Sequence, residues 1–135
     1  KLRMFDKCPE LESLLNINDL FKFDGVTTVH DTREELYLEV NGETICFMHG
    51  FRSKLGDHTR YNQISTVVGH SHRGGVVFHP VFYPRTKIHK TLFELNAGYL
   101  GDPSAKVMSY TSQKISNWTH GAGVIDEHGT RFISF

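Results

Sequence analysis

Residues 69–75, Gly-His-Ser-His-Arg-Gly-Gly, place two histidines one position apart at the end of a short apolar run. In an extended segment, residues i and i+2 point to the same side, about 6.5–7 Å apart along the chain. His70 and His72 can therefore aim two imidazoles into one pocket, or at two metal ions about 3.5–4 Å apart. The flanking glycines allow a close backbone approach or a positive φ. The pattern indicates a metal site at this turn.

A third histidine supports the same interpretation. His49 follows the apolar segment 44–48 as His70 follows the segment 65–69, and ligands often stand where a rigid strand passes into a loop. If the two strands are neighbours, three imidazoles converge, and three is the number of protein ligands in many catalytic zinc sites. The alternative is a set of ordinary surface or hydrogen-bonded histidines, and spacing alone leaves both interpretations open.

Four further residues are candidates to line the same pocket. Asp57 and His58 lie in the polar stretch 51–64, and His120 precedes the last strands, so all three can face the pocket. Arg73 directly follows the histidine pair, and a guanidinium fork binds phosphate oxygens in pairs. Arg73 is therefore a candidate phosphate contact, and a solvated surface arginine is the alternative.

Other polar and aromatic residues favour structural roles. Asn96 and Gly98 end an apolar strand, where a structural turn is the simpler interpretation. Trp118, the only tryptophan, is expected to pack in the core or at an edge. The remaining candidate histidines are interpreted as surface or hydrogen-bonded residues: His30, His79, His89 and His128.

Hydrophobic spacing divides the chain into a helical lead-in over 1–23 and a β-rich core over 26–135. Asn41-Gly42 predicts a type I′ hairpin, because both central positions of that turn need a positive φ. Strands are expected at 26–30, 36–40, 44–48, 65–69, 75–83, 90–95, 121–125 and 130–135, with a short helix within 51–64 and an irregular stretch over 96–117. The pattern predicts one α+β, β-rich domain over residues 1–135.

The amino-acid composition bears on the partners and the compartment of the chain. Lys+Arg and Asp+Glu are both 15, so no net charge draws the chain to nucleic acid or to a membrane surface, although local patches can hide in a neutral total. Cys8 and Cys46 do not make a disulfide framework, which favours a reducing, cytoplasmic compartment. No apolar run approaches the length of about 18 residues that a membrane span needs.

The histidine motifs resemble those of a known family. Gly69-His70-Ser71-His72 resembles the Gly-His-[Ser/Thr]-His motif that closes the calcineurin-like metallophosphoesterases, and Met48-His49-Gly50 resembles the motif that precedes it. Asn96-Ala97-Gly98 is similar to the family's asparagine–glycine turn. Asn117-Trp118 with His120-Gly121 is similar to the tail of small phage and bacterial members. The resemblance covers about residues 45–135, and it implies the C-terminal half of a two-sheet αββα sandwich.

The resemblance also implies a chemistry. His49 and His70 would ligate one metal and His72 the other, the metals being Mn, Zn or Fe. In the family these metals activate a bridging water that attacks phosphorus in line. The implied substrate is a phosphomonoester or a phosphodiester, and the implied location is the cytoplasm, in the host cell if the chain is of phage origin.

Three motifs that lie upstream in the family, Asp-x-His, Gly-Asp-x-x-Asp and Gly-Asn-His-[Asp/Glu], do not occur before His49 in the sequence. Residues 1–3 resemble the segment that comes directly after the third motif in the family, so the chain is expected to be the C-terminal half alone. Two close divalent ions without a bridging carboxylate would repel each other strongly. We therefore expect a dinuclear site only where the N-terminal half is supplied. A weak single zinc on the three histidines, with His58 or Asp57, is the alternative.

The sequence leaves three functions open. The first is half of a metal-dependent phosphoesterase, completed by a separate N-terminal piece. The second is a non-catalytic binding or regulatory module that acts through protein–protein contact, as a homo-oligomer or with another protein, since half of a sandwich exposes an apolar face and open strand edges. The third is a zinc-dependent hydrolase built on His49, His70 and His72 alone.

Overall fold

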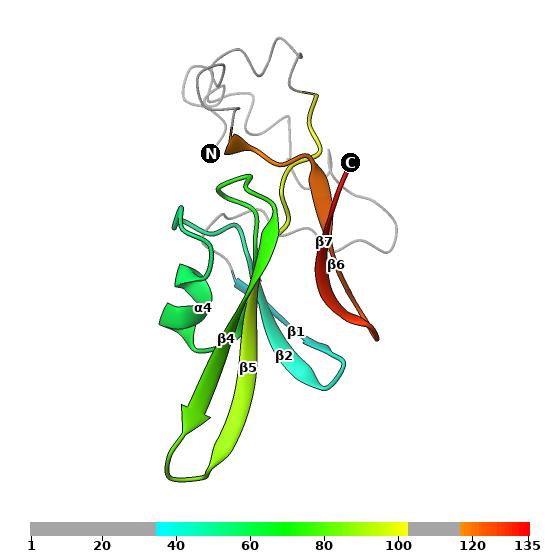
Figure 1. Ribbon diagram of the computed structural model, residues 1–135. Helices are drawn as coiled ribbons and strands as arrows, with labels where there is room; N and C mark the ends of the chain where they lie inside the picture. Colours follow the sequence, from blue (N-terminus) through cyan, green and yellow to red (C-terminus); the bar gives the residue numbers. More distant parts are fainter. Residues whose placement is uncertain (1–34, 103–116) are drawn as a thin grey trace, which may run out of the picture. The chain divides into compact units, whose positions relative to one another are not determined.

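The computed structural model describes residues 35–102 and 117–135, and all of them belong to one unit of the chain (Figure 1). The expected helical lead-in over 1–23 and the expected strand over 26–30 lie outside the described residues, as does most of the irregular stretch 96–117. Within the described ranges the chain forms seven strands and one short helix. The prediction of an α+β, β-rich fold is confirmed at this level.

Five strands form one mixed sheet in the order β1-β2-β3-β5-β4. Its strands are β1 (Glu35–Val40), β2 (Glu43–Met48), β3 (Ser65–Val68), β4 (Gly75–Tyr83) and β5 (Ile88–Asn96). β2, β3 and β5 run parallel to one another, and β1 and β4 pair antiparallel at the two edges. Ile45 and Cys46 are adjacent in β2 and both are buried, so both faces of the sheet are covered at that point.

Local turn chemistry sets the first hairpin. Asn41 and Gly42 have φ values of 54° and 77°, so both adopt the left-handed conformation that the Asn-Gly pair predicts. The turn aligns Val40 with Glu43 and Glu35 with Met48. The expected strands at 36–40 and 44–48 are confirmed, and the interior place expected for the second of them is confirmed by its pairing with both β1 and β3.

The helix α4 (Asp57–Asn62) lies in the connection between β2 and β3, where a loop and a short helix were expected. A second sheet consists of the hairpin β6 (Gly121–Asp126) and β7 (Gly129–Ser134), whose last strand contacts β4 and β5. The core between these layers is built on Ile45, Phe93 and Leu95, with Ile125 and Phe132 packed against them.

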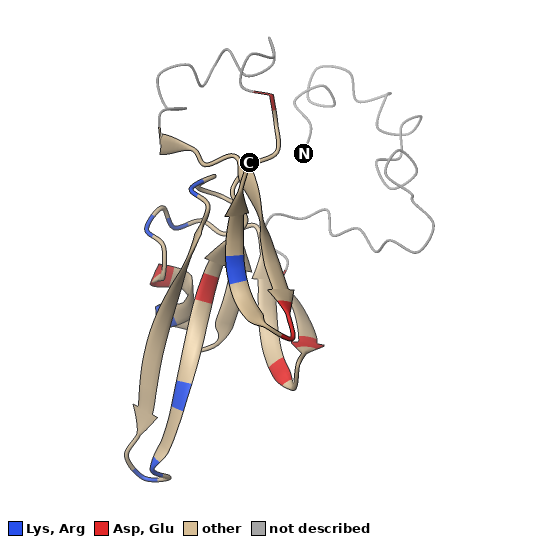
Figure 2. Ribbon diagram, turned by 45° about the vertical axis from the view of Figure 1, so that its right-hand side comes forward, with Lys and Arg blue, Asp and Glu red and all other residues tan. Residues whose placement is uncertain are grey.

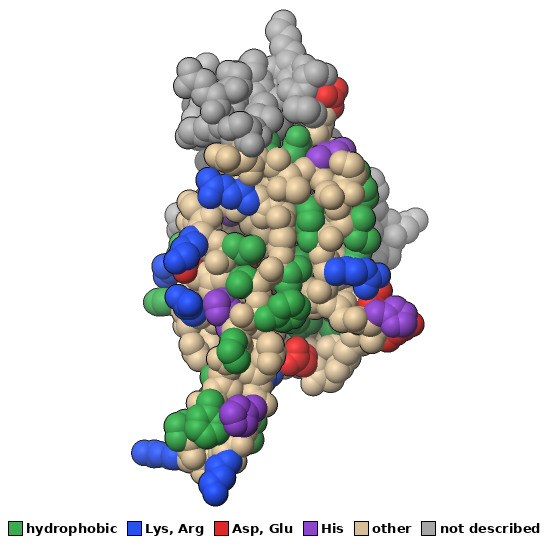
Figure 3. Space-filling model, viewed as in Figure 1, with side chains coloured by type: hydrophobic (Ala, Val, Ile, Leu, Met, Phe, Trp, Pro, Cys, Tyr) green, Lys and Arg blue, Asp and Glu red, His purple; other side chains and the backbone are tan. Residues whose placement is uncertain are grey.

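The β4–β5 hairpin is longer than its neighbours and reaches past the turns of the other two hairpins (Figures 1 and 2). β5 starts at Ile88, two residues before the expected strand 90–95, because nine consecutive pairs with β4 extend it. Apolar side chains, cations and a histidine gather on the surface of its outer part (Figure 3).

The core predicts a clear difference between two leucines. Leu95 is 1 % exposed and Leu38 is 43 % exposed. Leu95→Ala is expected to lower the free energy of unfolding by about 2–5 kcal/mol, because it removes buried apolar area and leaves a cavity. Leu38→Ala is the matched control and should change stability by less than about 0.5 kcal/mol. Urea unfolding of both variants measures this, and equal losses would contradict the described core.

Candidate functional site

The two histidine-bearing strands are neighbours, as the sequence-based prediction required. β2 and β3 pair in parallel, so their carboxyl ends meet at the same edge of the sheet. His49 follows β2, and its carbonyl oxygen accepts the amide hydrogens of Gly69 and His70 at 3.1 and 2.9 Å. These two backbone bonds hold the start of the His70 turn directly beside His49.

The imidazoles of His49 and His70 are in contact. Nδ1 of His70 lies 3.2 Å from Nε2 of His49, and the two rings meet edge to face at a centroid distance of 5.2 Å. One ring nitrogen of the pair therefore donates a hydrogen bond to the other. Both side chains are exposed, which leaves their remaining nitrogens open to a ligand.

His72 is placed differently from the expectation. Residues 69–72 form a tight turn, closed by a hydrogen bond from the His72 amide to the Gly69 carbonyl, and His72 has a φ of +58°. The chain is therefore not extended here, and the i, i+2 rule does not aim both rings to one side. The His72 ring instead stacks on Tyr99 and meets Trp118 edge to face, with centroid distances of 6.3 and 4.2 Å.

The number of ligands that come together is small. Within residues 35–102 and 117–135, no group of three or more His, Cys, Asp and Glu side chains is arranged to hold a metal ion. Nδ1 of His72 is buried and lacks a hydrogen-bond partner among the described residues. The site thus consists of a histidine pair and a third imidazole nearby with one unsatisfied nitrogen.

Electrostatics keep two of these imidazoles neutral. Although the His49 side chain is exposed, part of its ring is desolvated by neighbouring atoms; this lowers its pKa below the usual value, and repulsion from His70 lowers the pKa further. Burial is also the larger cause that lowers the pKa of His72, followed by repulsion from His49 and then from His70. Near neutral pH both rings therefore carry a free lone pair, which is the form that binds metals.

His58, an additional ligand candidate, has a structural role. Its Nε2 accepts the amide hydrogens of Phe51 and Arg52 at 3.0 and 3.1 Å, which places the ring proton on Nδ1. Nδ1 lies 3.4 Å from Oε1 of Glu94, and both side chains are 1 % exposed. Because both ring nitrogens are engaged, His58 anchors the loop that follows His49 and offers no free nitrogen to a metal.

Glu94 completes this anchor, a role that was not predicted from the sequence. Its Oε2 accepts the amide hydrogens of His58 and Thr59 at 2.8 and 3.0 Å, in the first turn of α4. The hydroxyl of Thr59 donates to the carbonyl of Phe93 at 2.8 Å. A signal was available, because Glu94 is the one charged residue in the apolar run 92–95.

The other candidates surround the pair without joining it. Asp57 lies in the first turn of α4 and is half-buried, and Arg73 is exposed immediately after the His72 turn. His120 is exposed, with its ring 5.3 Å from that of Tyr99 and 5.7 Å from that of Phe135. Of these residues, Arg73 is the exposed cation beside the His72 turn, and it remains the candidate phosphate contact.

Asn96 ties the end of β5 to the histidine turn. Its Nδ2 donates to Oγ of Ser71 at 2.7 Å, and its Oδ1 accepts the amide hydrogen of Gly98 at 3.1 Å. The interpretation of Asn96 and Gly98 as a structural turn is confirmed, and Gly98 has the positive φ of 71° that favours glycine. Ser71, between the two histidines, is thereby a positioning residue.

Phe132 of β7 sits on three glycines around the same turn. A Cβ atom on Gly74, Gly98 or Gly121 would lie 1.9, 2.8 or 2.6 Å from the nearest atom of the Phe132 ring. The amide of Thr119 also donates to the carbonyl of His72 at 2.9 Å. The second sheet therefore closes over the His72 turn, and only glycine leaves room for it.

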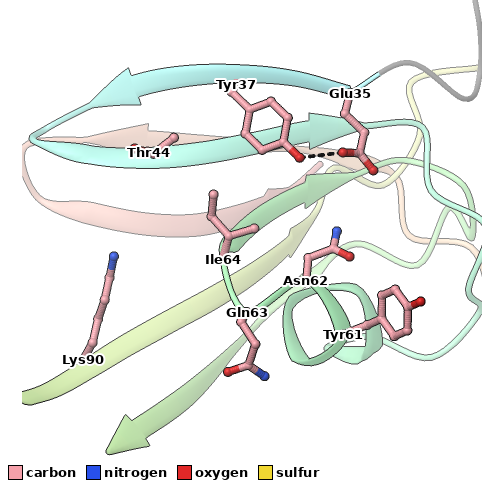
Figure 4. A pocket seen from close by; sticks show the side chains of 8 residues that line it. All are labelled: Glu35, Tyr37, Thr44, Tyr61, Asn62, Gln63, Ile64 and Lys90. Atoms are coloured by element: carbon pink, nitrogen blue, oxygen red, sulfur yellow. Dashed lines mark hydrogen bonds between the residues drawn. The ribbon is translucent and has the colours of Figure 1, made fainter. Parts of the chain in front are cut away.

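A separate hollow of about 630 Å³ lies between the β1–β2 hairpin and the end of α4 (Figure 4). Its lining includes Tyr61, Asn62 and Lys90 but no histidine. Within it the hydroxyl of Tyr37 points toward Glu35 and donates to Oε2 at 2.5 Å, and this bond is the main cause that raises the pKa of Tyr37 to about 12. The hollow is chemically distinct from the histidine site.

Comparison of the chain with protein-family models, with curated proteins and with solved structures found no match. The resemblance to metallophosphoesterases therefore rests on the sequence motifs alone. Among the described residues, no helix has the length and apolar character needed to cross a membrane.

The histidine pair generates a pH prediction for the metal-free protein. In EDTA, the ring resonances of His49 should titrate below about pH 6.5, the usual histidine midpoint. The unfolded chain then takes up its proton first, so the free energy of unfolding should fall as the pH drops below that value. His70→Ala should raise the pKa of His49 without fully restoring it, since burial is the larger cause. An NMR titration in which His49 protonates at or above pH 6.5 would contradict the described geometry.

The close packing of the Phe132 ring against glycines generates a second prediction. Gly74→Ala forces the Phe132 ring to move and should lower the free energy of unfolding by about 1–3 kcal/mol. Gly69→Ala is the control, because its Cβ would meet no described atom within 4 Å.

A double-mutant cycle tests the contact between Phe132 and Gly74 directly. In a Phe132→Ala background the Gly74→Ala penalty should largely vanish, because the clashing ring is gone. Thermal or urea unfolding of the four proteins measures this coupling. Additive effects of the two substitutions would show that Phe132 does not rest on Gly74.

Proposed function

We propose that this chain is the C-terminal part of a metal-dependent phosphoesterase, built on one half of an αββα sandwich. The observation that carries the proposal is the contact between His49 and His70 at the ends of two parallel strands, with 3.2 Å between their nitrogens. His72 adds a buried, unsatisfied Nδ1 nearby. Neutral imidazoles gathered at the end of a sheet are suited to bind a divalent metal such as Mn, Zn or Fe.

The imidazoles are suitable metal ligands, but too few ligands come together to form a complete site. Imidazole is a common ligand of these metals, yet the described residues assemble no group of three ligands. The remaining ligands would be carboxylates from outside this chain, on a separate N-terminal piece. A phosphoesterase of this kind is active only when both parts are present.

The residues of the chain would share the work on a phosphate ester. A divalent metal, when bound, neutralises phosphoryl charge and lowers the pKa of its bound water. His49 stays neutral through partial burial and the repulsion of His70, so one of its ring nitrogens carries a lone pair at neutral pH. Arg73, exposed beside the turn, can pair its guanidinium with two phosphate oxygens of a monoester or diester.

The edge of the sheet favours a second candidate function, a non-catalytic binding module. Among the described strands, β1 lies at an edge of the sheet, and its Tyr37 and Leu38 are 51 % and 43 % exposed. An exposed edge with apolar side chains invites pairing with another protein. A chain that binds a protein partner through β1 and takes up no metal would support this module over the phosphoesterase.

The phosphoesterase proposal predicts weak metal binding that depends on the histidine pair. Zinc and Mn²⁺ titrations followed by calorimetry should show binding that His49→Ala or His70→Ala weakens by at least about tenfold, a loss that even outer-shell changes can cause at metal sites. His128→Ala is the control, because His128 lies in the β6–β7 turn and is 78 % exposed. Equal affinity in all variants would contradict the assignment of these ligands.

Activity is expected only after complementation. The chain alone with Mn²⁺ should hydrolyse a nitrophenyl phosphodiester poorly, and a polypeptide carrying the three missing motifs should restore hydrolysis. Arg73→Ala in the restored complex should raise KM, because it removes a phosphate contact. The absence of hydrolysis from a complex that forms and binds metal would overturn the proposal.

A further inference from the structure

The neutral total charge conceals a basic segment. From His58 to Phe93 the sequence contains no Asp or Glu, and its cations are Arg60, Arg73, Arg85, Lys87 and Lys90. The carboxylates of the other two hairpins are Glu35, Glu39, Glu43, Asp126 and Glu127. Figure 2 shows basic residues on the outer part of β4–β5 and acidic residues on β1–β2 and β6–β7. The exceptions are Arg131 on β7, which pairs with Asp126, and the buried Glu94 on β5.

Three of these five cations, Arg85, Lys87 and Lys90, lie on a projecting ribbon. Pairing of β5 with β3 stops at Glu94, so among the described strands residues 88–93 pair with β4 alone. We call residues 78–91 the arm. Its turn is charged, since Pro84-Arg85-Thr86-Lys87 joins the two strands, and all four of these residues are exposed.

The arm also presents aromatic rings to solvent. Phe78 and Phe82 are four residues apart in β4, so their side chains point to the same face of the strand, and they are 54 % and 51 % exposed. His89 lies opposite Phe82 and stacks on it, with ring centroids 4.5 Å apart and an interplanar angle of 30°. The arm therefore carries exposed aromatic rings near its cations, and Figure 3 shows hydrophobic and histidine side chains beside Lys and Arg at its outer end.

This combination selects one kind of partner. Single-stranded nucleic acid offers base faces to aromatic rings and phosphates to cations, in alternation along an extended chain. A duplex hides its base faces, and an acidic protein would leave the rings unused. A lipid bilayer is disfavoured as the partner. Arg85 and Lys87 lie in the turn at the tip of the arm, so both cations would have to enter the membrane before the Phe82 ring could reach it.

We propose that the arm binds single-stranded nucleic acid, with bases stacked on Phe78 and Phe82 and phosphates paired with Arg85 and Lys87. Lys90 contributes less, because its ammonium lies 3.4 Å from the Glu43 carboxylate. This site is independent of the proposed metal chemistry, so its binding needs no divalent ion.

The first test measures binding of a labelled oligothymidylate of about 16 nucleotides, the upper site size of single-strand binding folds, by fluorescence anisotropy in EDTA. Phe82→Ala should weaken binding by about 5- to 150-fold, the usual effect of losing one stacked base. Leu38→Ala removes an exposed apolar side chain from β1 and is the matched control. Circular dichroism checks that each variant is folded.

The second test measures the salt dependence. Replacing Arg85 and Lys87 with Gln should lower the slope of log affinity against log salt by about 1.4, which corresponds to two phosphate contacts on a single strand. Lys54→Gln, which removes an exposed cation outside the arm, should leave the slope unchanged.

Four outcomes would overturn the proposal: no binding in low salt, equal affinity for a duplex, tighter binding to vesicles of anionic lipid, or equal losses in the control variants. Because every measurement is made in EDTA, failure of the phosphoesterase proposal leaves these results unaffected. Conversely, loss of oligonucleotide binding would say nothing against the histidine ligands.

Discussion

A buried carboxylate holds the histidine site together. Glu94 is 1 % exposed on the central strand β5, and burying a charge without partners is strongly unfavourable. Its oxygens are satisfied by two amides of α4 and by the His58 ring. His58 in turn accepts the amides of Phe51 and Arg52, so one carboxylate fixes the whole connection that follows His49. Parallel pairing of β2 with β3 requires a crossover connection, and α4 in that connection contacts β3 and β5.

A second constraint acts from the opposite side of the sheet. The Phe132 ring occupies space that three glycines leave open, and Asn96 bonds Ser71 from the end of β5. Both contacts converge on the turn of residues 69–74, whose His72 adopts a positive φ that is uncommon outside glycine. The turn is therefore held in its conformation by packing on one face and by a side-chain hydrogen bond at its centre.

The sequence predicted the local features of this fold better than the long-range ones. Asn41-Gly42 needs only its own φ preferences to form the first turn, and the described strands show clear apolar patterns. The left-handed conformation of His72 has no local signal, because it results from contacts with residues 25 or more positions away. The bond between Glu94 and His58 likewise joins residues 36 positions apart, so no local pattern predicts it, although a charge within the apolar run 92–95 marks Glu94 as unusual.

Ligation of a metal by both His49 and His70 has an energetic cost. The hydrogen bond between His49 and His70 must break if both rings are to ligate, and a typical hydrogen bond contributes only about 0.5–1.5 kcal/mol. Structural zinc sites bind with apparent free energies of about 10–16 kcal/mol. The contact between the rings is therefore a minor obstacle to ligation. The decisive quantity is the number of ligands, because a pair of imidazoles with His72 nearby lacks the carboxylates that would offset the repulsion between two divalent ions.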